Sequence, residues 1–184
     1  MKNKFDYVSI TVAILSIVSL LNGNFVYVMK NRVSKMSPSS GFDFVGNIFW
    51  IPLILLGIIV INGIVNKKKL IFYSSLISSS VIIINFIFFI LGTDNILLKN
   101  QSTRVSFGLN FYFVFILLIS LIIRNSYQEK NIVKKYFPLT ITLCLLSLFF
   151  IMGFMDKSSI MVEYYTRKDK FISTLFEHIY LCWA

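Results

Sequence analysis

Residues 70–92 read LIFYSSLISSSVIIINFIFFILG, a run of 23 residues without one charged side chain. A helix of this length extends about 34 Å, and the hydrocarbon core of a bilayer is about 30 Å thick. The apolar residues lie in an unbroken charge-free run and not in the half-buried periodic pattern that a soluble core needs. The stretch therefore predicts a membrane-spanning helix.

Four further charge-free runs flank this one along the chain. They cover residues 7–28, 48–65, 107–123 and 137–155. A single charge at the centre of a spanning helix costs about 2.5–3.5 kcal/mol, so charge-free runs between charged loops are a consistent signal. They predict an all-α integral membrane protein with a domain of five transmembrane helices in residues 1–155. The first run has a polar interruption at residues 22–24, which leaves its end open, and the fifth begins with Pro138 in its first turn.

Composition and charge support the bilayer as the main partner. Of the residues, 57% are hydrophobic and 14% are charged, against roughly 25% charged in soluble domains. The net charge of +10 comes from basic residues between the apolar runs and not from one patch, so nucleic acid is not an expected partner. Cys144 and Cys182 lack the spacing of a metal site or a disulfide framework, and no cofactor is expected.

The loop charges predict an orientation in the membrane. The side that holds the N-terminus carries nine Lys and Arg, and the opposite side carries five before the tail, whose four basic residues would make the totals equal. Because the earlier helices usually dominate, we predict a cytoplasmic N-terminus and a tail outside. Lys2 and Lys4 before an apolar stretch also suit a signal peptide, but no small-x-small cleavage site follows Leu21, which favours a retained anchor.

The tail, residues 156–184, is too charged to span a bilayer and is predicted to be an amphipathic helix outside the membrane. Glu163 and Arg167 form an i,i+4 pair of the favourable order. Apolar residues recur near one face: Ile160, Tyr164, Phe171, Leu175 and Ile179. A new apolar segment begins at Ile179.

Catalytic chemistry has little support in the sequence. No pair of intramembrane carboxylates, GxSxG motif or GxxxxGK[ST] motif is present, so we predict that the chain is not an enzyme and that another chain supplies any ATP energy. His178 has no second His or Cys at ligand spacing and is interpreted as a surface histidine. Asn85 and the serines at 78–80 are interpreted as helix-packing residues and not as a substrate site.

Three polar clusters remain as candidate interaction motifs, and on the predicted topology all three face the outer side. They contain Asn31 with Arg32; Arg104 with Ser106 and Gly108; and Glu163 with Tyr164, Arg167 and His178. A purely structural interpretation is also available for Arg104, which with Ser102 and Ser106 is placed to cap the fourth helix and to reach the membrane interface.

In this order and spacing the clusters resemble the N-terminal membrane extension of bacterial ABC-importer permeases that move glycine betaine, choline or related amines. That group has an Asn-Arg-hydrophobic-Ser stretch, an Ala-Arg-x-Ser-x-Gly-x-x-Phe-Trp stretch and a Glu-Tyr-x-Asn-Arg stretch. The matching positions here are Asn31, Arg32, Ser34, Arg104, Ser106, Gly108, Phe111, Glu163, Tyr164 and Arg167. Thr103, Tyr112 and Thr166 depart from the pattern, and Glu177 and His178 suit a related Glu-His form that opens the transport domain.

The resemblance implies a permease component that lacks its transport domain, with an ABC ATPase subunit, a permease domain and a substrate-binding protein as partners. It carries over no substrate-binding residue, because the aromatic cage expected for a quaternary ammonium would belong to other parts of such a system. The alternative is a stand-alone membrane protein with a structural or regulatory role. In that case the tail helix is the interaction surface.

Overall fold

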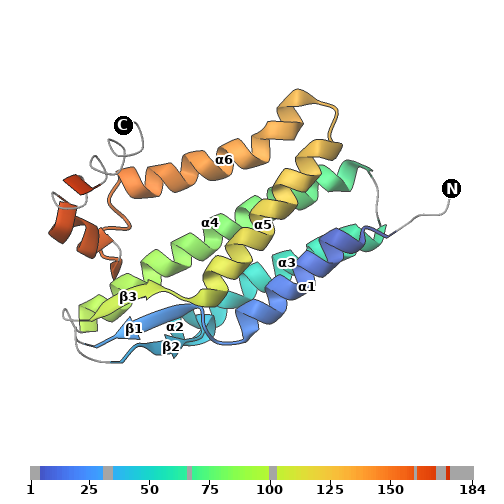
Figure 1. Cartoon of the computed structure of the whole chain (residues 1–184). Coiled ribbons are helices and arrows are strands. Elements are labelled where there is room, and N and C mark those ends of the chain that lie inside the picture. Colours follow the sequence, from blue (N-terminus) through green and yellow to red (C-terminus); the bar gives the residue numbers. More distant parts are fainter. Residues whose placement is uncertain are drawn as a thin grey trace.

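The computed structural model describes residues 5–30, 35–65, 68–99, 103–159, 161–168 and 173–174. Its elements are drawn in Figure 1. The helices are α1 (Tyr7–Leu21), α2 (Gly41–Val45), the 3-10 helix η1 (Gly46–Phe49), α3 (Trp50–Val65), α4 (Lys68–Lys99), α5 (Leu109–Gln128) and α6 (Ile132–Ile151). The strands are β1 (Val26–Met29), β2 (Ser37–Ser39) and β3 (Arg104–Phe107).

The long helices run side by side as a bundle (Figure 1). Helix α1 packs against α3 and α5, α4 packs against α3 and α5, and α6 lies against α4 and α5. The strands, α2 and the segment after α6 gather at one end of the bundle, and the start of α1 lies toward the other (Figure 1). We call these the sheet end and the N-terminal end.

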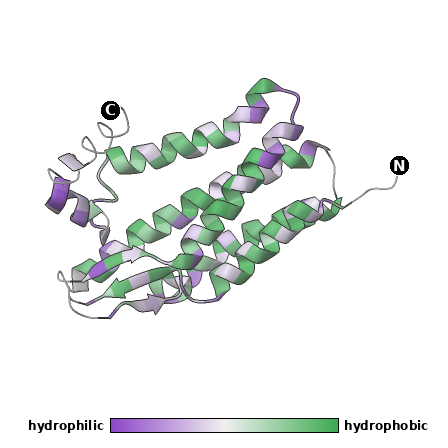
Figure 2. Ribbon diagram, in the orientation of Figure 1, coloured by the Kyte–Doolittle hydropathy of each residue, from purple (hydrophilic) through white to green (hydrophobic). Residues whose placement is uncertain are grey.

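Four helical segments are long and apolar enough to cross a membrane. They are Gly41–Val65, Lys69–Leu97, Leu109–Gln128 and Ile132–Ile151. Hydrophobic residues cover the middle of the bundle, while hydrophilic residues concentrate at its two ends (Figure 2). Many large apolar side chains on the outside are exposed, including Ile54, Ile61 and Ile116 at 61%, 59% and 63%. This distribution is typical of an integral membrane protein.

The first apolar run is only partly helical. Helix α1 ends at Leu21 and not at residue 28, because Asn22 caps the helix through its backbone N–H and Gly23 adopts a positive φ of 84° that suits glycine. Its 15 residues extend about 22 Å, less than the thickness of the hydrocarbon core. The predicted bounds of this helix are therefore wrong, and a fifth full span stays a prediction.

A small antiparallel sheet corrects the prediction of a purely α-helical fold. The strand order is β2-β1-β3, and Tyr27 of β1 pairs with Pro38 on one side and with Ser106 on the other. Pro38 lies on an edge strand, where the missing N–H is tolerated. β-branched and aromatic residues favour extended backbone in β1, which reads VYVM. The sheet thus joins the segment after α1 to the segment before α5.

Aromatic rings fill the junction between the sheet and the bundle. Phe25 and Phe49 are almost fully buried, with ring centroids 5.1 Å apart. The rings of Phe89 and Phe107 stack at 3.9 Å, and Phe111 lies 5.5 Å from Phe25. Pairs of this kind contribute about 0.5–1.5 kcal/mol beyond the burial of their area. The junction is therefore a packed core that fixes β3 on the helices.

Serines line the buried face of α4, as predicted for helix packing. Ser78 and Ser79 are buried and donate hydrogen bonds to the carbonyls four residues earlier, and Asn85 is buried as well. The Ser79 hydroxyl also lies 3.0 Å from the carbonyl oxygen of Pro138 in α6. Ser80 differs, because its side chain is exposed. Helix α6 begins at Ile132, so Pro138 lies inside the helix and not in its first turn.

The segment after α6 departs from one continuous helix. Turns follow Ile151 through residue 157, with Gly153 at a φ of 72°, and helical structure is described at 161–168 and 173–174. Lys157 forms an ion pair of 2.7 Å with Asp94 near the end of α4. The remaining part of the predicted tail helix lies outside the described residues, so its amphipathic face stays a prediction.

Candidate functional site

Six of the nine candidate residues belong to the part of the chain that the structure describes. Asn31, Arg32 and His178 lie outside the described residues. The six that are described are Arg104, Ser106, Gly108, Glu163, Tyr164 and Arg167. All six lie at the sheet end, in β3, in the residue that follows it or in the helix at 161–168.

Strand β3 positions Arg104 and Ser106. They pair with Met29 and Tyr27 of β1, so neither caps α5. Helix α5 begins after Gly108, which makes no side-chain cap hydrogen bond. The structural role expected for Arg104 as a cap of that helix is therefore wrong.

Gly108 is held against the backbone that follows α1. Its N–H donates a 2.9 Å hydrogen bond to the carbonyl of Phe25, and a Cβ added at this position would overlap the carbonyl of Asn24. The backbone at Gly108 is extended, with a φ of −80°, so the close approach and not the conformation requires glycine. This matched motif residue thus has a packing role.

A parallel bridge brings the tail to β3. Val105 pairs with Ser158, and both are buried. The bridge, with the Lys157–Asp94 ion pair beside it, sets where the helix at 161–168 starts relative to the sheet. The bridge thereby brings the helix at 161–168 beside β3, although the two are far apart in the sequence.

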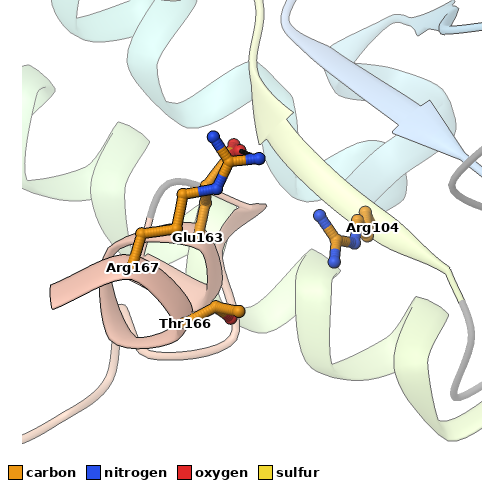
Figure 3. Close-up of a pocket in the computed structure, with 4 residues that line it drawn as sticks. All are labelled: Arg104, Glu163, Thr166 and Arg167. Atoms are coloured by element: carbon orange, nitrogen blue, oxygen red, sulfur yellow. Dashed lines mark ion pairs between the residues drawn. The ribbon is translucent and has the colours of Figure 1, made fainter. Parts of the chain in front are cut away.

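The result is an open pocket of about 260 Å³ lined by Arg104, Glu163, Thr166 and Arg167 (Figure 3). Arg104 comes from β3, and the other three come from the helix at 161–168 (Figure 3). Arg167 and Glu163 form the predicted i,i+4 ion pair at 3.5 Å, with side chains 71% and 58% exposed. The Thr166 hydroxyl donates to the carbonyl of Val162.

The chemistry of this pocket suits an anion. Two guanidinium groups against one carboxylate leave a net positive charge, and a guanidinium binds carboxylates in a planar, bidentate geometry. Among its described lining residues there is no aromatic ring to attract a quaternary ammonium. The arrangement fits an acidic side chain of another protein better than it fits an amine substrate.

Tyr164 and its neighbour Tyr165 lie on the same helix, but neither lines the pocket. Their ring centroids are 5.7 Å apart. The Tyr165 hydroxyl donates a 3.2 Å hydrogen bond to Asp156, and this bond together with the charge of Asp156 raises the pKa of Tyr165. Tyr165 therefore stays protonated and fixes the turn after α6 to the helix at 161–168.

Two further features could not be predicted from the sequence. One is an ion pair between Asp6 and Arg124 at the N-terminal end, and the other is a group of lysines around the start of α4. The lysines contribute to the loop charges that predict the orientation in the membrane. Their convergence in space, however, depends on the packing of α4 against α6. Within the described ranges no group of three His, Cys, Asp or Glu is placed to hold a metal.

No protein-family model, curated protein or solved structure matches the chain.

Proposed function

We propose that the chain is a membrane component of an ABC importer for osmoprotectants such as glycine betaine or choline, equivalent to the N-terminal part of the permease. In this proposal it binds neither ATP nor substrate. It anchors and positions partners through the sheet end.

The observation that carries the proposal is the meeting of two motif stretches at one pocket. Arg104 belongs to the second stretch and Glu163 and Arg167 to the third, and all of them line the same open cavity. Stretches that match a permease extension and also meet in space support a common role. An exposed arginine, Arg167, beside the half-buried Arg104 supports docking of an acidic surface from a transport domain or a substrate-binding protein.

The four long apolar helices support a membrane anchor, and hydrophilic residues at both ends of the bundle support contact with proteins on either side (Figure 2). The alternative remains a stand-alone structural or regulatory protein. It is favoured by the core that α1, α3, α4 and α5 build among themselves, since a bundle with its own buried core is able to fold without a partner.

The test is uptake and complex formation in the native host. We expect deletion of the gene to reduce uptake of radiolabelled choline or glycine betaine at high osmolarity. The tagged chain should purify with an ABC ATPase subunit and a substrate-binding protein. The double variant R104A/R167A should weaken this association, while K35A, a charge change at the same end but away from the pocket, should not. Unchanged uptake, together with purification free of both partners, would favour the stand-alone alternative.

A further inference from the structure

A second pocket opens at the N-terminal end of the bundle, opposite the sheet. It has a volume of about 730 Å³ and lies between the first turns of α4 and the connection from α5 to α6. Three lysines line it, namely Lys69, Lys130 and Lys134. None belongs to the motif stretches, and the importer proposal does not use them.

The lysines leave an uncompensated positive charge. Glu129 is the one carboxylate among the described lining residues, and within the described part of the chain none of the three lysines forms an ion pair. Lys69 lies in the first turn of α4, where the positive end of the helix dipole already disfavours a cation. Such a cluster is stabilised by a bound anion.

Apolar and aromatic side chains also line the same pocket. Phe72 and Tyr73 line it, and the Lys134 ammonium group lies 5.7 Å from the centroid of the Phe72 ring. The Tyr73 side chain is 55% exposed. Cationic groups beside aromatic rings, at the end of membrane-spanning helices, match the interface where headgroups meet acyl chains.

We propose that this pocket binds the phosphate-containing headgroup of an anionic phospholipid. The lysines contact the phosphate, and Phe72 and Tyr73 contact the glycerol and the first carbons of the acyl chains. A lipid is favoured over a soluble phosphate because exposed apolar side chains follow Lys134 along α6 toward the middle of the bundle, with Phe137 and Leu143 45% and 52% exposed. The proposal rests on the membrane location of the helices and not on the importer function.

The test uses the full chain in nanodiscs made from equal parts of phosphatidylcholine and phosphatidylglycerol. Native mass spectrometry after release reports which lipids stay bound. We expect wild type to retain phosphatidylglycerol in preference to phosphatidylcholine. In K69Q/K134Q the ratio of retained phosphatidylglycerol to phosphatidylcholine should fall about tenfold. The matched control K35Q/K157Q removes two lysines at the sheet end and should keep it. K69R/K134R retains the charge and should also keep most of it.

Three outcomes would overturn the proposal. One is equal retention of both lipids by wild type. Another is equal preference in K69Q/K134Q and K35Q/K157Q, with both variants folded by circular dichroism. The third is displacement of phosphatidylglycerol by millimolar glycerol 3-phosphate or inorganic phosphate, which would identify a soluble anion as the ligand.

Discussion

Asp6 and Arg124 join the start of α1 to the last turns of α5 at the N-terminal end of the bundle. The Arg124 guanidinium donates a 2.7 Å hydrogen bond to the Asp6 carboxylate, whose side chain is only 11% exposed. The same carboxylate accepts hydrogen bonds from the hydroxyl and the N–H of Ser9, and the Asp6 N–H donates to the carbonyl of Gly63. One residue thus caps α1 and connects it to α3 and α5.

The variant Asp6→Asn removes the ion pair with Arg124 but keeps the N-cap of α1. Asparagine caps helices about as well as aspartate, so α1 keeps its N-cap while the charge interaction with Arg124 is lost. We expect a loss of about 1–2 kcal/mol, between the values for exposed and buried ion pairs, because Arg124 is 34% exposed. Thermal unfolding in detergent micelles measures the effect.

The control for this prediction is Lys157→Gln, which breaks the more exposed ion pair with Asp94. Its expected effect is below about 1 kcal/mol. Equal losses in both variants would contradict the importance assigned to burial at Asp6.

Acid should weaken the same connection. Burial favours a raised pKa for Asp6, but the hydrogen bonds from Arg124 and Ser9 and the charge of Arg124 outweigh it and lower the pKa. A lowered pKa in the folded state stabilises the protein above the unfolded value, near pH 4, and this contribution is lost as the pH falls below it. The difference in melting temperature between wild type and Asp6→Asn should therefore shrink between pH 6 and pH 3. A constant difference across this range would contradict the lowered pKa.

The membrane helices could be predicted from the sequence because their signal is local. A charge inside a span is costly, so charge-free runs mark α3, α4, α5 and α6 without knowledge of their neighbours. The ion pair of Glu163 with Arg167 was predictable for the same reason, since i,i+4 spacing alone sets it.

The sheet and the shared pocket depend on long-range pairing. β1 and β3 have four residues each, too few for a clear alternating pattern, and the segment between Tyr27 and its partner Ser106 holds β2, α2, η1, α3 and α4. The meeting of Arg104 with Glu163 likewise needs the bridge of Val105 to Ser158. Asp6 and Arg124 are 118 positions apart, so no local pattern connects them.

Gly108→Ala should destabilise the junction of β3 with α5. An added Cβ overlaps the carbonyl of Asn24, a backbone group that cannot rotate away, so a loss of roughly 1–3 kcal/mol is expected. The matched control is Gly57→Ala in α3, where nothing lies within 4 Å of the new Cβ and alanine is the better helix former. Unfolding in detergent should show a lower melting temperature for Gly108→Ala and an equal or higher one for Gly57→Ala. Equal tolerance of both changes would contradict the close approach.

Ser79→Ala should loosen α6 from α4. The Ser79 hydroxyl lies 3.0 Å from the carbonyl of Pro138, and its loss should cost about 0.6–1.7 kcal/mol, as for other hydrogen bonds between membrane helices. Ser80→Ala is the control, because Ser80 is exposed and donates only to the carbonyl of Leu76 in its own helix. Hydrogen exchange of α6 amides should rise in the first variant alone.

The two ends of the bundle should differ in their access to the exterior. Lys35 lies at the sheet end and Lys130 at the N-terminal end, and both are exposed. With Cys144 and Cys182 replaced by serine, we expect a membrane-impermeant maleimide to label K35C in intact cells. K130C should be labelled only after permeabilisation, because the basic loops of that end are predicted to stay in the cytoplasm. Labelling of K130C alone in intact cells would show the opposite orientation. Labelling of both positions in intact cells would contradict a bundle whose two ends lie in different aqueous compartments.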